Sequence, residues 1–158
     1  MRHVIAFITL FSLLTVFLAA DVARGDVESG LAKGTQAPKL AVLWLNDSDG
    51  YEEKDLSKDQ GEKTVVYLFI QQGEWSRPMA RFVRGVDEAA AKTADANVIA
   101  VWVGDDVDAA KEYLPRGRNA LKLQTTDFAV HPGDKTGPDG WGVNDRAFLT
   151  AVVVKNGK

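Results

Sequence analysis

Short apolar runs separated by charged segments set the pattern of the chain from residue 40 onward. Runs at 40–45, 64–70, 97–103 and 148–154 are rich in aliphatic and aromatic residues, and their length and composition are typical of buried β-strands. The run at 64–70 continues with apolar residues after its first position, which is typical of a central strand covered on both faces. The pattern therefore predicts a sheet with residues 64–70 near its middle.

Helical spacing follows the second of these runs. Ser76 is a suitable N-cap residue, and Pro78 fits the first turn of a helix, where its missing N–H costs nothing. The apolar positions that recur at helical spacing are Met79, Phe82, Val83, Val86 and Ala90. A second, shorter helix is expected from Asp106 to Leu114, where Pro115 should end it.

The other segments are less regular. Residues 51–63 are charged and predict a loop or a short helix around Leu56, residues 120–124 a short strand, and residues 125–142 a long loop rich in Gly and Pro. The resulting order of strand, helix, strand and helix favours an α/β fold whose parallel strands are joined by right-handed crossovers.

The chain follows its last apolar run with Asn156-Gly157, a pair that normally begins a β-hairpin. Two interpretations stay open. Either the sheet ends there with an exposed edge, or the chain is truncated and lacks a C-terminal strand and helix.

The first 25 residues have the pattern of a secretory signal peptide. Arg2 precedes an uncharged apolar stretch at 4–20, which is short for a bilayer span. Small residues allow cleavage before Asp26, and cleavage after Ala20 is the alternative. We therefore expect a signal peptide at 1–25, a lead-in at 26–39 and one domain at 40–158, in a secreted or periplasmic protein without a membrane anchor after cleavage.

The amino-acid composition limits which partners and reactions are open to this chain. The 158 residues are 46% hydrophobic and 26% charged, as in one globular domain. Nineteen basic and 22 acidic residues give a net charge of −3, so no basic excess favours a nucleic-acid partner. The sequence contains no Cys, which excludes disulfides, thiolate metal sites and every thiol-based redox step by this chain alone.

The pattern of possible ligands predicts neither a metal nor a cofactor. There are two His, one of them in the expected signal peptide, so no transition-metal cluster is expected. The acidic segment 46–50 fails the calcium-loop pattern, because Leu45 and Leu56 stand where the first and twelfth ligands belong.

Several motifs occur in an order known from one superfamily. Gly34-x-x-Ala37-Pro38 opens the series, Asp49-Gly50 precedes Leu56, and Trp75-Ser76-Arg77-Pro78-Met79 follows the central strand; Trp141-Gly142-Val143 precedes the last strand. Together they resemble the thioredoxin-like superfamily, in particular its exported redoxin branch, which includes the alkyl hydroperoxide reductases and thiol-specific antioxidants. The resemblance implies a three-layer sandwich around a central mixed sheet.

In that family, Trp-Cys-x-Pro-Cys stands where this chain has residues 75–79. The first family Cys lies at a helix N-terminus, which stabilises its thiolate. Here Ser76 and Met79 occupy the two cysteine positions, so dithiol chemistry is impossible. Leu149 precedes Thr150 where the family usually has a cis-proline that helps bind extended substrates.

The resemblance places candidate binding residues around these two degenerate positions. They are Trp75, Arg77, Pro78, Trp141, Leu149 and Thr150, with Trp75 and Trp141 expected to flank Ser76 and a protein or peptide as the expected partner. Ser76 could act as a nucleophile only with a base, and His131 is the sole His after residue 25. We therefore expect Ser76 to be an N-cap.

Three arginines, Arg77, Arg81 and Arg84, accompany the predicted helix. They form either an anion site at its start or a solvated face paired with Glu74, Asp87 and Glu88, and the second interpretation is preferred.

The leading hypothesis is a thioredoxin-like domain without redox catalysis that serves as a binding or structural module. One alternative is an antioxidant-type enzyme in which the Ser76 hydroxyl activates an external thiol such as glutathione. The other is a truncated, non-functional product.

Overall fold

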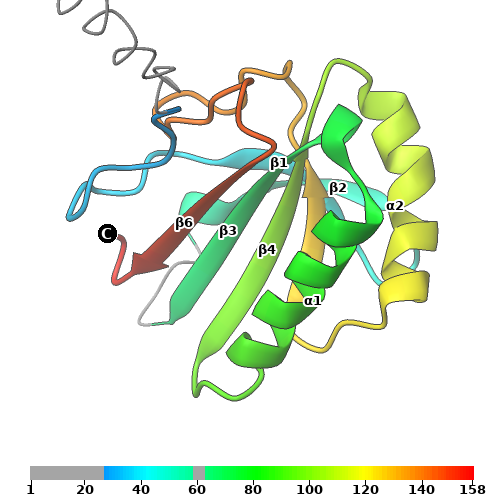
Figure 1. Cartoon of the computed structure of the whole chain (residues 1–158), viewed down its shortest axis with the longest axis horizontal. Helices are drawn as coiled ribbons and strands as arrows, with labels where there is room; N and C mark the ends of the chain where they lie inside the picture. Colours follow the sequence, from blue (N-terminus) through cyan, green and yellow to red (C-terminus); the bar gives the residue numbers. More distant parts are fainter. Residues whose placement is uncertain (1–26, 59–62) are drawn as a thin grey trace, which may run out of the picture.

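A six-stranded mixed sheet forms the centre of the molecule, in the strand order β2-β1-β5-β4-β3-β6 (Figure 1). The computed structural model describes residues 27–58 and 63–158. The strands are β1 (Ala41–Leu45), β2 (Tyr51–Asp55), β3 (Thr64–Gln71), β4 (Ala96–Val103), β5 (Thr126–Val130) and β6 (Leu149–Lys155). The helices are α1 (Arg77–Ala90) and α2 (Val107–Leu121), with short 3-10 turns η1 (Leu56–Lys58) and η2 (Gln72–Glu74).

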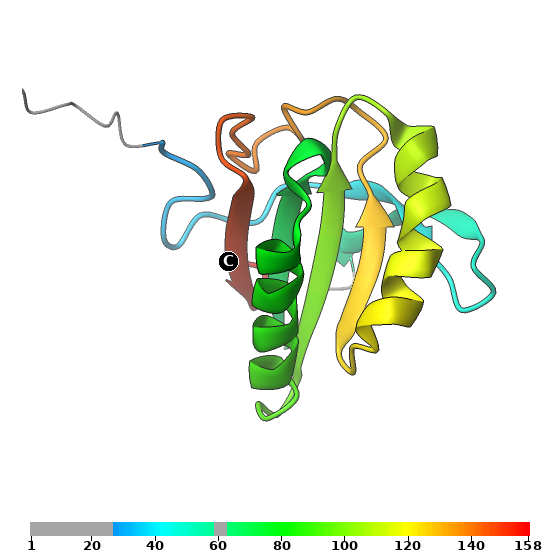
Figure 2. The ribbon, with the colours of Figure 1, turned by 45° about the vertical axis from the view of Figure 1, so that its right-hand side comes forward.

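The three middle strands are parallel. β3 pairs with β4, and β4 pairs with β5, while β6 and β1 run antiparallel to β3 and β5. The crossovers α1 and α2 both cover one face of the sheet (Figure 2). The predicted α/β class with a central mixed sheet is confirmed.

Each face of the sheet carries its own apolar core. On the helix side, Ile70 and Trp102 of the sheet pack with Val83 of α1 and Leu114 of α2. On the other side, the cluster that contains Phe69 is covered by irregular segments, which contribute residues such as Leu40, Leu56 and Trp141. The sandwich therefore has three layers, and the layer opposite the helices consists of the lead-in, η1 and the loop after β5.

The charged segment after β1 forms β2, where a loop or short helix was expected. β2 pairs antiparallel with β1 from Ala41↔Asp55 to Leu45↔Tyr51. It is the edge strand of the sheet, and Glu52 and Glu53 are exposed. Charged side chains are compatible with an edge strand because backbone hydrogen bonds form the pairing.

α2 does not end before Pro115, as the sequence predicted, but continues to Leu121. A proline inside a helix leaves the carbonyl four residues earlier without its hydrogen bond. Here the Tyr51 hydroxyl donates to the Lys111 carbonyl at 3.1 Å. The tertiary contact satisfies the carbonyl that Pro115 frees.

The region after α2 also differs from the prediction. The expected strand at 120–124 is the end of the helix followed by Lys122, whose left-handed φ of 51° terminates it. The strand is β5 instead, within the expected long loop, and its Phe128 and Ala129 are fully buried. Five residues starting with Thr-Asp were too short and too polar a run to indicate this strand from periodicity.

The hairpin turn predicted at Asn156-Gly157 is confirmed. Both residues have positive φ, 53° and 75°, as a type I′ turn requires. Lys155 and Lys158 exchange two backbone hydrogen bonds of 2.8 and 3.1 Å.

The predicted signal peptide lies outside the described residues. Within the part of the chain that is described, no helix is long and apolar enough to cross a membrane.

Candidate functional site

The candidate site lies where β3 leads into α1. Ser76 is in an extended conformation just before the helix, and its Oγ accepts a hydrogen bond from the Met79 N–H at 3.5 Å. Pro78 is in the first helical turn. The N-cap role predicted for Ser76 is confirmed, and Ser76 and Met79 occupy the mouth of a helix that follows a central strand.

Beside this helix start is a groove of about 560 Å³, hereafter the α1 groove. Its lining residues come from η2, α1 and the start of β6, and they are Gly73, Glu74, Trp75, Ser76, Pro78, Met79, Phe82, Phe148 and Leu149. Glu74 is the one charged residue among them. The predicted residues Trp75, Pro78 and Leu149 are therefore brought together with the two degenerate positions.

Sequence reasoning missed two aromatic residues of the α1 groove. Phe82 is 46% exposed and Phe148 is 63% exposed. The periodicity that located α1 assigned Phe82 to the helix's buried face, and Phe148 was assigned to the last strand. One signal was available, since Phe82 directly precedes Val83 and two adjacent helical residues lie about 100° apart around the axis.

The indole of Trp75 is held in place by two other elements. Its Nε1–H donates a 2.6 Å hydrogen bond to the Tyr113 hydroxyl of α2. Its ring centroid lies 4.7 Å from that of Trp102 in β4. One wall of the α1 groove is therefore fixed before any ligand binds.

Arg77 is exposed at the first position of α1 but does not line the α1 groove. Arg81 and Arg84 are also exposed. Among the described residues no ion pair within 4.0 Å joins these arginines to Glu74 or Glu88. The anion site, which was the less preferred interpretation, stays untested.

The prediction that Asp87 pairs with these arginines on a solvated face is wrong, because Asp87 is only 2% exposed. The Asp87 carboxylate accepts hydrogen bonds from the backbone N–H of Gln124 and Thr125 and from the hydroxyls of Thr125 and Thr126. Burial acts to raise the pKa of Asp87, but these hydrogen bonds outweigh it and hold the pKa below its usual value. Asp87 joins α1 to the connection before β5.

Trp141 does not flank Ser76, so this part of the site prediction is wrong. Its side chain is fully buried in the core opposite the helices, with ring centroids 4.9 Å from Tyr67 and 5.2 Å from Phe69. Its Nε1–H donates to the Lys39 carbonyl at 3.2 Å. By packing its large aromatic surface on the sheet, Trp141 holds the loop after β5 in place.

Thr150 lies on the same face of the sheet as Trp141, because side chains alternate along β6. It is 1% exposed, and its Oγ1 has no hydrogen-bond partner among the described residues. Leu149 reaches the α1 groove and Thr150 does not.

His131 follows β5, and its Nδ1 is buried without a hydrogen-bond partner in the described chain. Burial lowers its pKa, against the opposing effect of Asp134 and Asp139. No hydrogen bond links His131 to Ser76, whose Oγ accepts from Met79 N–H. In the described ranges no three His, Asp or Glu side chains are arranged to hold a metal ion.

Several solved structures share this fold. One is a DsbF homologue from Corynebacterium diphtheriae, with a TM-score of 0.60 and 19% identity over 84% of this chain and 79% of that chain. Another is a putative protein disulfide isomerase from Bacteroides thetaiotaomicron, with a TM-score of 0.57 and 17% identity over 82% of this chain and 77% of that chain. A third is the exposed lipoprotein thioredoxin of Streptococcus pneumoniae, with a TM-score of 0.54 and 20% identity over 77% of this chain and 84% of that chain.

No protein-family model and no curated protein matches the sequence. At these identities the similarity to solved structures establishes the fold. The fold implied by the resemblance in the sequence is thereby confirmed: the chain has the thioredoxin-like fold, and it contains no cysteine.

Proposed function

We propose that this protein is an exported thioredoxin-like domain that binds an extended polypeptide and performs no thiol chemistry. The observation that carries the proposal is the α1 groove, an apolar depression with exposed Phe82 and Phe148 at the place where Ser76 and Met79 replace two cysteines. The expected ligand is a segment that carries large apolar side chains.

The residues at the helix start do not support thiol–disulfide exchange. A serine hydroxyl attacks only with a neighbouring base, and the Ser76 Oγ is engaged as the cap of α1. The Met79 thioether can be oxidised to a sulfoxide but forms no disulfide. Ser76 and Met79 therefore contribute a binding surface and not a reactive group for thiol–disulfide exchange.

The α1 groove has the physical properties of a binding surface. Apolar surface gains about 25 cal/mol per Å² when it is removed from water, and Phe82 and Phe148 expose much of theirs. The contacts of Trp75 with Tyr113 and Trp102 fix one wall, which reduces the entropy lost on binding. Export is supported by the signal-peptide pattern at 1–25 and by the fold shared with an exposed lipoprotein thioredoxin.

The test is fluorescence anisotropy with a fluorescein-labelled Gly/Ser peptide that contains a central Leu-Phe-Leu. We expect Phe82→Ser and Phe148→Ser each to weaken binding about tenfold, because each removes more than ~1 kcal/mol of apolar contact. Val27→Ser is the matched control, since Val27 is 39% exposed and lies outside the groove. Equal affinities for all three variants, or for a peptide with Ser in place of Leu-Phe-Leu, would refute the proposal.

A further inference from the structure

Met79 is the one methionine among the residues that the structure describes, and it lines the α1 groove. Its side chain is half-buried and packs on one side against the core beneath α1. On its other side is the groove, with a volume of about 560 Å³. A methionine in a sealed core is protected because no oxidant reaches its sulfur. Met79 forms the wall of an open groove, so its side chain is accessible to small molecules from solvent.

The surface around Met79 suits an apolar sulfur. The rings of Trp75, Phe82 and Phe148 line the groove with it, and a thioether is polarizable and packs well against such rings. Oxidation to the sulfoxide makes the same side chain polar, because the added oxygen is a hydrogen-bond acceptor. One modification therefore changes the chemistry of the surface that receives apolar side chains.

The groove supplies few side-chain donors for such an oxygen. Only Trp75 and Ser76 among its lining residues carry an N–H or O–H on the side chain. The Trp75 Nε1–H is donated to the Tyr113 hydroxyl, and the Ser76 hydroxyl caps α1. The Glu74 carboxylate offers acceptors only. A sulfoxide oxygen on Met79 would therefore depend mainly on water, which an apolar ligand displaces.

We propose that Met79 is an oxidation site that controls the α1 groove, an inference that rests on the proposed function. Hydrogen peroxide transfers one oxygen atom to the sulfur: the O–O bond breaks, an S–O bond forms, the sulfur loses two electrons, and water leaves. The thioether form binds apolar segments and the sulfoxide form releases them. Methionine sulfoxide reductases reverse the step with a dithiol, which becomes a disulfide while the oxygen leaves as water.

The size of the effect follows from desolvation. A polar group that is covered without a hydrogen bond weakens an association by roughly ten- to hundredfold. We therefore expect the sulfoxide form to bind an apolar peptide at least about tenfold more weakly. A bound peptide also covers Met79, so it should slow the oxidation.

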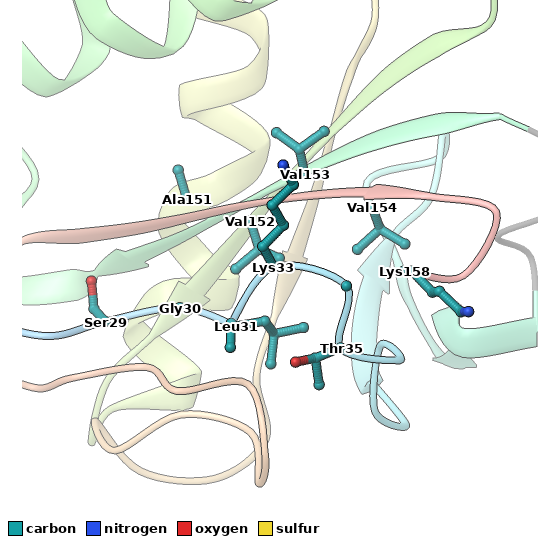
Figure 3. Close-up of a pocket in the computed structure, with 12 residues that line it drawn as sticks. Ser29, Gly30, Leu31, Lys33, Thr35, Ala151, Val152, Val153, Val154 and Lys158 are labelled. Carbon is teal, nitrogen blue, oxygen red and sulfur yellow. The ribbon is translucent and has the colours of Figure 1, made fainter.

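A matched control position lies in a second pocket, of about 240 Å³, between the lead-in and β6 (Figure 3). Figure 3 shows Thr35 among the residues that line it. Thr35 is exposed, and no residue lines both this pocket and the α1 groove. The double variant Met79→Leu/Thr35→Met therefore carries the sulfur in another concave surface, away from the α1 groove.

The first measurement is the oxidation itself. The full chain is treated with hydrogen peroxide, the reaction is stopped with catalase, and tandem mass spectrometry assigns the added oxygen to Met79 or to Trp75. We expect Met79 in the folded chain to be oxidised at a rate within about tenfold of its rate in the urea-unfolded chain. The Leu-Phe-Leu peptide should slow this reaction, and the peptide with Ser in place of Leu-Phe-Leu should not.

The second measurement is fluorescence anisotropy with the Leu-Phe-Leu peptide, which contains no sulfur. Peroxide treatment should weaken its binding to the wild type at least about tenfold, and reduction by the two methionine sulfoxide reductases should restore it. Met79→Leu and Met79→Leu/Thr35→Met should each bind equally before and after peroxide, whatever their own affinities. Met79→Gln, which introduces a polar amide without oxidation, should bind more weakly than Met79→Leu.

Three results would overturn the proposal. They are oxidation of Met79 more than about tenfold slower in the folded than in the unfolded chain, equal peptide affinities of the thioether and sulfoxide forms, and a loss of affinity after peroxide in Met79→Leu/Thr35→Met. A wild type that fails to bind the peptide before any treatment would instead refute the proposed function, and this inference with it. The two failures are distinguishable, because the oxidation of Met79 is also measured without the peptide.

Discussion

The Thr126 hydroxyl donates a 2.8 Å hydrogen bond to the Asp87 carboxylate, joining the first residue of β5 to the buried face of α1. The same carboxylate accepts the backbone N–H groups of Gln124 and Thr125. One acidic side chain thus holds the return of the chain from α2 into the sheet. Asp87 stabilises the scaffold that positions the α1 groove, although it does not line that groove.

Asp87→Ala is expected to lower the free energy of unfolding by about 3 kcal/mol, because buried donors left without an acceptor cost roughly 1–3 kcal/mol each. Urea unfolding followed by circular dichroism measures the change. Glu88→Ala, at the exposed next position, should change stability by less than about 0.5 kcal/mol. A similar small change for Asp87→Ala would show that the hydrogen bonds contribute little.

The same unfolding experiment addresses the hypothesis of a non-functional product. A single cooperative transition of the chain would argue against that alternative, whereas a broad, non-cooperative loss of signal would favour it.

The loss of stability at low pH should depend on Asp87. Its pKa is lower in the folded protein than in the unfolded chain, so its stabilising contribution is complete above the unfolded value of about 3.9 and is lost as pH falls through the folded value. The stability difference between wild type and Asp87→Asn should be constant from about pH 7 to about pH 5 and shrink near about pH 3. A constant difference at all three pH values would contradict the assignment.

His131 should act in a separate, higher pH window. Burial lowers its folded-state pKa, so the unfolded chain binds a proton first as pH falls below about 6.5. Stability should therefore be complete above that pH and decline below it until the folded-state pKa is passed. His131→Phe, which removes the titration, should flatten the urea midpoint between about pH 7.5 and about pH 5.5; an unchanged slope would rule out His131 as the cause.

Introducing cysteines at the two degenerate positions tests the geometry of the helix start. In the double variant Ser76→Cys/Met79→Cys we expect a disulfide. After reduction, the thiol introduced by Ser76→Cys should have a pKa below the ordinary value of about 8.5, because the unpaired N–H groups of α1 stabilise the thiolate. Thiol titration by absorbance near the thiolate band measures the pKa, with Ser76→Cys alone as the control for disulfide formation. Two unpaired thiols of ordinary pKa would contradict the resemblance at this site.

The enzymatic alternative makes the opposite prediction for Ser76. If the Ser76 hydroxyl activates glutathione, peroxide turnover should fall by about tenfold or more in Ser76→Ala. We expect the same background rate for both proteins, because the described structure shows no base bonded to Ser76 Oγ. A clear loss of turnover in Ser76→Ala would favour the enzyme.

The sequence predicted the sheet and α1 because their signals are local. Residues 64–70 contain nothing that suits a helix surface or a loop, and Ser76 with Pro78 marks a helix start in any context. Those two features were sufficient to locate the degenerate site at the end of a central strand.

The remaining features depend on contacts between distant residues. Tyr51 satisfies the carbonyl freed by Pro115 from 60 positions away, so a local rule ended α2 too early. Asp87 was expected on a charged helix face and Trp141 beside Ser76, yet each is buried by partners that only the fold provides. The α1 groove was therefore predicted in position but not in its complete lining.

The presence of Ser76 and Met79 at the two cysteine positions of the fold has a consequence for when the domain can act. A dithiol protein presents one surface when oxidised and another when reduced, so its contacts vary with the electron balance of its compartment. This chain presents the same hydroxyl and thioether whether glutathione is abundant or depleted. Its associations should therefore be independent of the thiol–disulfide balance of its compartment.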